Sequence, residues 1–122
     1  MIQSFRDLKV WQKGMVLAEH VYAASESLPR NEFEFKAQIR RASVSIPSNV
    51  AEGKALGGKG YMRHLRIALG SEAELQTQIE LSARLNLLNQ HQADALLIEC
   101  AEVGRMLSGL LKALARAPHR IA

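Results

Sequence analysis

Residues 38–53 read QIRRASVSIPSNVAEG and combine two arginines, a proline inside a helical pattern and a row of small polar side chains. The polar residues recur at steps of three and four, which places them on one helix face: Gln38, Arg41, Ser45, Ser48 or Asn49, and Glu52. An apolar stripe lies beside them on the same helix: Ile39, Ala42, Ile46 and Val50. The polar stripe is either a buried hydrogen-bonding seam or the lining of a site, and both alternatives are open.

This stretch belongs to a helix that we expect over residues 32–54, with Pro47 in its interior. An interior proline removes one backbone hydrogen bond and typically costs about 3 kcal/mol, so the helix should kink at residues 44–47. Two shorter helices with a turn at Ser45 and Ile46 are the alternative. The apolar stripe stays in phase across the proline, which favours one kinked helix.

Three more helices are predicted around this one. The first covers residues 5–28, begins at a capping box of Ser4 and Asp7 and ends at Pro29, with Asn31 capping the next helix. Residues 53–60 (GKALGGKG) contain four glycines and predict a loop. Helices over residues 61–88 and 92–116 follow, separated by a turn at residues 89–91. Short connections make neighbouring helices antiparallel, so we predict a single all-α domain over residues 1–122, an up-down-up-down four-helix bundle.

Composition narrows the class of protein further. Apolar residues make up 48% of the chain and aromatic residues 5%, which suits Leu- and Ala-rich helices. A lone cysteine cannot form an internal disulfide, and no signal peptide or membrane span is evident, so we expect a cytoplasmic protein without a membrane partner. No histidine lies three residues after a glutamate, the spacing used by di-metal bundles. We therefore expect no metal, no cofactor and no catalytic residues.

Charge is distributed in blocks along the chain, whose formal net charge is +4. Residues 36–66 carry seven basic groups against Glu52 alone, whereas residues 67–104 carry six acidic groups and one basic group. Such blocks indicate either a basic surface that could hold phosphates or complementary surfaces that pair between subunits.

Three motifs carry a resemblance to a known family: FRDLKVWQKGMVLAEHVY at residues 5–22, QIRRASVSIPSNVAEG at 38–53 and HLRIALGSEAELQTQIELS at 64–82. The chain resembles the bacterial large-subunit (23S) ribosomal RNA intervening-sequence proteins, which are similar to the accessory proteins of diversity-generating retroelements. The resemblance implies a four-helix bundle that assembles as a homopentamer and has no known catalysis. The accessory relatives imply nucleic-acid binding through a basic surface of the pentamer.

Several residues match the family pattern directly: Arg40, Arg41, Ser45, Pro47, Asn49, Glu52 and Gly53. Two departures stand beside them. After Gly53, where family members often have an arginine and an acidic or Ser-rich segment, this chain has two lysines and no arginine up to Gly60. The position after Ser71, which is commonly hydrophobic in the family, is Glu72 here.

The candidate nucleic-acid-binding residues form a basic set: Lys36, Arg40, Arg41, Lys54, Lys59, Arg63 and Arg66. Cations like these hold phosphate backbones through charge and counterion release, without reading sequence. The alternatives are a solvated face, or ion pairs with the acidic block of a neighbouring subunit. Few aromatic residues lie nearby, so base stacking has little support.

The candidate polar seam is a second set, drawn from the two middle helices: Ser45, Asn49, Glu52, Ser71, Glu74 and Gln78. If these helices pack antiparallel, the set forms a buried network that fixes their register. A catalytic pair of carboxylates is the alternative. Residues 53–60 nearly match the phosphate loop GxxxxGK[ST], but Gly60 provides no hydroxyl for magnesium and a helix precedes the motif, so nucleotide hydrolysis has little support.

The leading hypothesis is a non-enzymatic homo-oligomer that binds RNA or DNA backbone through the basic set, and the family resemblance implies that this oligomer is a pentamer. The first and last helices each carry two apolar stripes, which leaves surface for other subunits to cover. A protein-interaction scaffold that binds a protein partner and no nucleic acid is the alternative. A small-molecule or hydrolytic function, which needs an open pocket at Glu52 and Glu74, is third.

Overall fold

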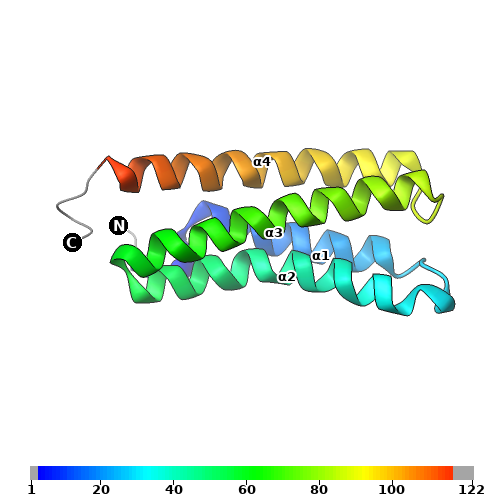
Figure 1. The fold of residues 1–122 in the computed structure, drawn as a ribbon, viewed down its shortest axis with the longest axis horizontal. Coiled ribbons are helices and arrows are strands. Elements are labelled where there is room, and N and C mark those ends of the chain that lie inside the picture. Colours follow the sequence, from blue (N-terminus) through cyan, green and yellow to red (C-terminus); the bar gives the residue numbers. More distant parts are fainter. Residues whose placement is uncertain (1–2, 117–122) are drawn as a thin grey trace.

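The computed structural model describes residues 3–116. Its elements, in order, are η1 (Phe5–Asp7), α1 (Lys9–Ser25), η2 (Arg30–Glu32), α2 (Phe33–Leu56), α3 (Gly58–Arg84) and α4 (Gln90–Ala115), with no strand in the described part of the chain. The four long helices alternate in direction along one axis, and α4 ends at the same end of the molecule as the α2–α3 connection (Figure 1). The prediction of an all-α four-helix bundle is confirmed.

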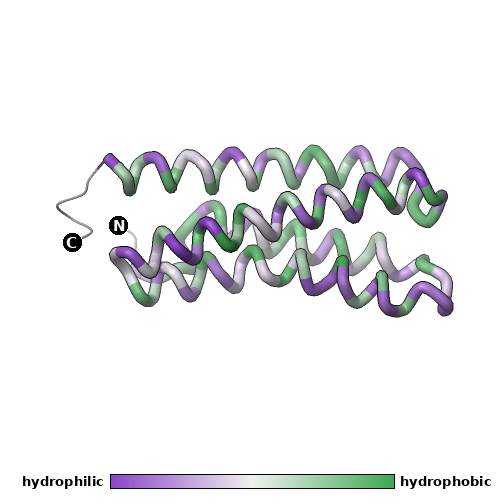
Figure 2. The backbone as a smooth tube through the Cα atoms, viewed as in Figure 1, coloured by the Kyte–Doolittle hydropathy of each residue, from purple (hydrophilic) through white to green (hydrophobic). Residues whose placement is uncertain are grey.

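Each long helix packs against its neighbours in sequence, and α1 packs less extensively against α4 to close the bundle. All four helices contribute fully buried side chains to one core, among them Leu17, Ile46, Leu75 and Leu107. Figure 2 shows hydrophobic and hydrophilic residues alternating along the helices, as expected for elements that turn one face to a shared core. Two surface pairs join α1 to α4: Lys13 with Glu102 at 3.2 Å and His20 with Glu99 at 2.8 Å.

The first helix is shorter than predicted. The capping box is present, since the Ser4 hydroxyl accepts from the Arg6 amide and the Asp7 carboxylate accepts from the Ser4 amide, but it caps only the one-turn helix η1. Leu8 is extended (φ −75°, ψ 127°), and this bend lets the Phe5 ring pack edge-on against Trp11 with centroids 5.4 Å apart. The helix therefore begins at Lys9 rather than residue 5, and it ends at Ser25 rather than residue 28.

The predicted loop over residues 53–60 is wrong. α2 continues to Leu56 and α3 begins at Gly58, so only Gly57, with φ +70° and ψ 178°, lies between them. Gly53 allows α2 to pack closely against α3, because a Cβ atom at this position would lie 2.9 Å from the Cβ of His64. Glycine at these two positions thus allows a tight helical hairpin.

Pro47 lies inside α2, which runs unbroken from Phe33 to Leu56. The alternative of two shorter helices is therefore wrong, while the size of the predicted kink stays a prediction. The buried proline ring faces α1, where a Cβ atom on Gly14 would lie 3.5 Å from the Cβ and Cδ of Pro47. The turn between α3 and α4 comes earlier than predicted, and the Asn89 side chain caps α4 by accepting from the Gln92 amide at 2.7 Å.

Candidate functional site

The basic set does not form one patch. Lys36, Arg40 and Arg41 lie in the first half of α2, whereas Lys54 and the α3 residues lie around the α2–α3 connection. Lys36 and Lys54 are 18 positions apart, which corresponds to about 27 Å along the helix axis at 1.5 Å per residue. The two groups therefore form two separate surfaces.

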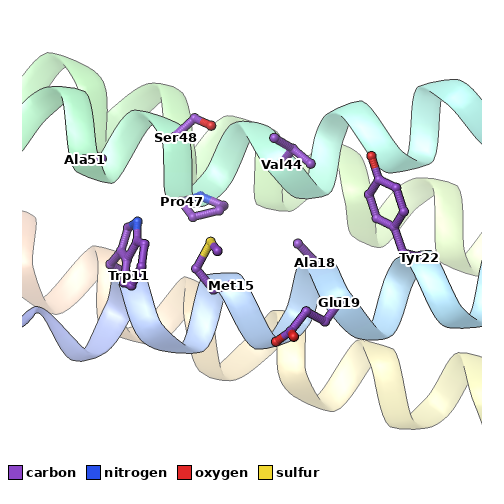
Figure 3. Close-up of a pocket in the computed structure, with 9 residues that line it drawn as sticks. All are labelled: Trp11, Met15, Ala18, Glu19, Tyr22, Val44, Pro47, Ser48 and Ala51. Atoms are coloured by element: carbon purple, nitrogen blue, oxygen red, sulfur yellow. The ribbon is translucent and has the colours of Figure 1, made fainter. Parts of the chain in front are cut away.

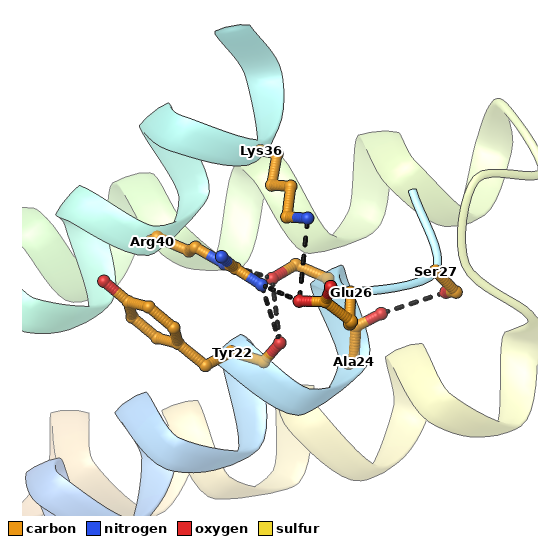
Figure 4. Close-up of polar contacts among 7 residues, drawn as sticks. Tyr22, Ala24, Glu26, Ser27, Lys36 and Arg40 are labelled. Carbon is orange, nitrogen blue, oxygen red and sulfur yellow. Dashed lines mark hydrogen bonds and ion pairs between the residues drawn. The ribbon is translucent and has the colours of Figure 1, made fainter. Parts of the chain in front are cut away.

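Arg40 is held within the chain at the end of α1 (Figure 4). Its Nε donates to Ser25 Oγ at 2.8 Å, and its Nη2 donates to the Tyr22 carbonyl at 3.0 Å and to Glu26 Oε2 at 2.9 Å. The guanidinium lies 4.4 Å from the centre of the Tyr22 ring. A cation at a helix C-terminus also interacts favourably with the helix dipole, so Arg40 caps α1.

Lys36 shares the same carboxylate, with Nζ 3.6 Å from Glu26 Oε2. The hydrogen bond from Arg40, followed by the charges of Lys36 and Arg40, lowers the pKa of Glu26. Both cations are thus paired and only partly exposed, with about a quarter of the Lys36 side chain and a fifth of the Arg40 side chain accessible. They are poorly placed to bind a phosphate.

The remaining cations lie near the α2–α3 connection. Lys59, Arg63 and Arg66 are exposed and spaced by four and three residues, so they share one face of α3. Lys54 lies 5.8 Å from the centre of the Tyr61 ring. No ion pair joins these four residues to an acidic side chain of residues 3–116. We call them the cationic end.

Part of the predicted polar seam is a continuous hydrogen-bonded chain between α2 and α3. Ser45 Oγ and Ser71 Oγ are 2.8 Å apart, and Asn49 Nδ2 donates to the Ser45 carbonyl at 2.8 Å and to Ser45 Oγ at 3.1 Å. His64 Nδ1 lies 2.8 Å from Asn49 Oδ1. Because that amide oxygen can only accept, the proton of a neutral His64 lies on Nδ1. Nε2 then accepts from Arg63 at 3.3 Å.

His64 was missing from the predicted seam, although its position in the sequence could have indicated it. It lies on the same i, i+4, i+7 row as Ser71, and the row continues to Gln78. His64 is buried against α2, close to Gly53, where the two helices approach most tightly. A polar residue on the packed face of a helix needs a polar partner on the facing helix, which here is Asn49.

The other predicted seam residues make no hydrogen bond to this chain. Glu52 is largely exposed, and its Oε2 lies 3.8 Å from His64 Nδ1. Glu74 is exposed, ten residues beyond His64 on α3 or about 15 Å along the axis. Glu52 and Glu74 therefore form no carboxylate pair. Gln78 is buried, and its Oε1 has no hydrogen-bond partner within the described residues.

Beside the Ser45–Ser71 contact lies a pocket of about 440 Å³, here called the α2–α3 pocket. α2 contributes Gln38, Arg41, Ala42 and Ser45 to its lining, and α3 contributes Ser71 and Glu74. The polar stripe of residues 38–53 is therefore divided: Ser45 and Asn49 form the seam, while Gln38 and Arg41 face an open pocket.

A second hollow, here called the apolar groove, runs between α1 and α2 (Figure 3). It encloses about 570 Å³ and is lined almost entirely by apolar groups, from Trp11, Met15, Ala18, Glu19, Tyr22, Val44, Pro47, Ser48 and Ala51. Tyr22 and Val44 also line an adjoining hollow of about 700 Å³ that includes Phe33, two-thirds exposed. This side of the bundle therefore presents a long apolar surface.

Glu72 fills the position that is commonly hydrophobic in the family, and it is buried between α3 and α4. Burial raises the pKa of its carboxyl, and a hydrogen bond from Gln76 opposes this effect. A Cβ atom on Gly104 would lie 2.7 Å from Glu72 Oε1, so the glycine makes room for the carboxylate. Burial, followed by the charges of Glu72 and Glu99, raises the pKa of the fully buried Cys100 to about 12, which rules it out as a thiolate nucleophile at neutral pH.

Residues 3–116 contain no group of three His, Cys, Asp or Glu side chains placed to hold a metal ion. None of the helices formed by those residues has an apolar stretch long enough to span a membrane.

Comparisons with known proteins agree with this architecture. The chain is similar to the crystal structure of a protein with unknown function from the S23 ribosomal protein family of Bacteroides thetaiotaomicron, with a TM-score of 0.79, 23% identity, and 84% of this chain and 95% of that chain covered. A search of curated proteins finds no match. Residues 6–109 match the family described as 23S rRNA-intervening sequence protein. Since the match spans most of the bundle, the chain belongs to the 23S rRNA-intervening sequence protein family.

Proposed function

We propose that this protein is a non-enzymatic, homopentameric helical bundle of the cytoplasm that binds RNA or DNA backbone. The cationic end is the observation that carries the proposal. Lys59, Arg63 and Arg66 are exposed on one helix face without acidic partners among the described residues, whereas Lys36 and Arg40 are paired with Glu26. Unpaired cations on one face bind phosphates and release counterions from the nucleic acid.

The cationic end favours contact with backbone over contact with bases. Among residues 3–116, the aromatic ring that lies against one of these cations is Tyr61, which is buried under Lys54 and offers little surface on which a base could stack. Lys112 and Arg116 near the end of α4 are also exposed, and α4 ends at the same end of the bundle (Figure 1). A larger positive field therefore surrounds this end.

The apolar groove is the surface through which we expect the protein to associate with other copies of itself. A long apolar surface lined by Trp11, Met15 and Tyr22 is typical of a protein–protein contact. The family resemblance is the basis for five copies. Repeating the cationic end around a ring would raise the avidity for a long polyanion without any new contact.

Nucleic-acid binding is tested by fluorescence anisotropy with labelled single-stranded RNA and DNA at several salt concentrations. The double variant Arg63→Ala/Arg66→Ala should bind more weakly and reduce the salt slope by about 1.4, since each phosphate contact on a single strand contributes about 0.7. Arg30→Ala/Arg84→Ala removes the same charge at the opposite end of the bundle and is the matched control. Equal affinity of the two double variants, or binding that does not respond to salt, would refute the proposal.

Oligomeric state is tested by light scattering after nuclease treatment. Met15→Glu places a charge in the apolar groove and should dissociate the assembly, whereas Val16→Glu changes a similarly exposed residue of α1 that does not line the groove. Dissociation by both variants, or by neither, would contradict the groove as the interface.

A protein-interaction scaffold is the second candidate, and the extent of the apolar groove favours it. A helix of another protein would lie in such a groove through apolar anchors at helical spacing. Two observations together would support the scaffold over the nucleic-acid function. The purified assembly would carry no nucleic acid, judged by its absorbance at 260 nm, and it would fail to bind RNA or DNA at low salt.

A further inference from the structure

The α2–α3 pocket has polar groups of different kinds on its two walls. Arg41 of α2 and Glu74 of α3 are both exposed, and no ion pair between them is present in the described chain. The partly buried Ser45 and Ser71 lie deeper, with their hydroxyl oxygens 2.8 Å apart. The pocket thus offers a cation, hydroxyls and a carboxylate within one cavity of about 440 Å³.

The hydrogen-bonded chain next to the pocket has a direction. Arg63 donates to His64 Nε2, so the His64 Nδ1 proton is donated to Asn49 Oδ1. The Asn49 amide then donates to Ser45 Oγ. When the Ser45 hydroxyl donates its hydrogen bond to Ser71 Oγ, all the donors of the chain point the same way. The chain then runs from His64 of α3 through Asn49 and Ser45 of α2 to Ser71 of α3.

Ser71 is the last member of this chain, and its hydroxyl proton is left over. With Ser45 donating to Ser71 in this arrangement, no hydrogen bond of residues 3–116 uses the Ser71 proton. Since Ser71 lines the pocket, its hydroxyl can donate to a bound group. Two donors, the Arg41 guanidinium of α2 and the Ser71 hydroxyl of α3, then line one pocket together with an acceptor, the Glu74 carboxylate, three residues after Ser71 on α3.

A simple anion matches only part of this arrangement, because the Glu74 carboxylate repels it. The lining of the pocket suits a ligand that carries both a negatively charged hydrogen-bond acceptor and a hydroxyl group that donates a hydrogen bond. We propose that the pocket binds one ribose-phosphate unit of RNA, with the phosphate at Arg41 and Ser71 and the 2′-hydroxyl donating to Glu74. This inference rests on the proposed nucleic-acid binding and adds to it a preference for RNA.

The 2′-hydroxyl is the group that distinguishes RNA from DNA at a given site. Phosphates are common to both polymers, so the cationic end and Arg41 bind either one. In the proposed arrangement Glu74 accepts a hydrogen bond from the 2′-hydroxyl, which DNA lacks. Its carboxylate should therefore affect the ratio of the two affinities, whereas the cations affect both affinities together.

The first experiment uses the whole protein and three single-stranded probes of one length: oligouridine, oligodeoxyuridine and 2′-O-methyl oligouridine. RNA should bind about tenfold more tightly than the other two, because each of those lacks the proton donated to Glu74. Equal binding of the three probes would overturn the inference and leave the proposed function intact. Absence of salt-sensitive binding to any probe would refute both.

The second experiment compares Glu74→Ala with Glu80→Ala, which removes an exposed carboxylate of α3 outside the pocket. Glu80→Ala should bind RNA and DNA slightly more tightly because one negative charge is lost. Glu74→Ala should bind DNA more tightly for the same reason but lose the hydrogen bond to RNA, so only this variant should abolish the RNA preference. Ser71→Ala should weaken binding of both polymers, whereas Thr77→Ala, whose hydroxyl already donates to the Ala73 carbonyl, should not. A preference that survives Glu74→Ala, or that falls equally in Glu80→Ala, would overturn the inference.

Discussion

Replacing Arg40 with alanine tests whether this arginine stabilises the fold or contacts a bound nucleic acid. The variant loses a charge-assisted hydrogen bond to Ser25, which is only 1% exposed, and the contact between the guanidinium and the Tyr22 ring. The bond is worth about 1.5 kcal/mol and the cation–π contact about 0.5 kcal/mol. The Tyr22 carbonyl keeps a hydrogen bond from Ser25 at 3.2 Å, and the pair with Glu26 is exposed, so neither adds to the sum. We expect a loss of about 2 kcal/mol in the free energy of unfolding.

Arg41→Ala is the matched control, because the neighbouring side chain is exposed and makes no ion pair with a described residue. Its free energy of unfolding should change by less than about 0.5 kcal/mol. Nucleic-acid affinity should respond in the opposite order, falling more in Arg41→Ala than in Arg40→Ala.

Urea unfolding followed by circular dichroism, at one protein concentration for all variants, measures the stability change. A loss below about 0.5 kcal/mol in Arg40→Ala, or an equal loss in both variants, would refute the assignment of Arg40 to the α1 cap.

Three further predictions concern the interior. Gly53→Ala should destabilise by about 1–3 kcal/mol because its Cβ would meet His64, whereas Gly70→Ala, with nothing within 4 Å, should stabilise α3 by up to about 1 kcal/mol; urea unfolding measures both. The buried thiol of Cys100, with its pKa of about 12, should react with a thiol reagent at pH 8 only after unfolding, and rapid labelling of the native protein would contradict this. Burial raises the pKa of Glu72 in the folded state, so the stability that this group contributes is present below its unfolded pKa and is lost as the pH rises through the folded pKa. Glu72→Gln should therefore be more stable than the natural protein at pH 7, and the difference should disappear near pH 4.

The helices were predictable because their interiors follow regular spacing, whereas their boundaries depend on contacts between distant segments. The capping box at Ser4 was predicted and is present, but Leu8 turns out of the helix so that Phe5 can pack on Trp11. Four glycines in eight residues predicted a loop, yet Gly53 is needed for the approach of α2 to α3. The sequence alone does not distinguish a glycine that permits close packing from a glycine that permits a turn.

The candidate site was predictable to a similar degree. Ser45, Asn49 and Ser71 form the hydrogen-bonded chain that the polar stripe indicated. The sequence shows the seven cations without their partners, however, and the pairing of Arg40 with Glu26 depends on how α1 ends beside α2. Charge blocks reveal how many cations a segment carries, and only the tertiary structure shows which of them are already neutralised.

The single residue that joins α2 to α3 also has a consequence for the order of folding. Closing a connection of one glycine costs little chain entropy, so we expect the α2–α3 hairpin to form most readily among the pairs of helices. The contacts between α1 and α4 join segments far apart in the chain, since His20 and Glu99 are separated by 79 positions, and they are the least extensive in the bundle. In hydrogen exchange, amides of α2 and α3 should therefore be the slowest to exchange, and the molecule should open first along the line where α1 meets α4.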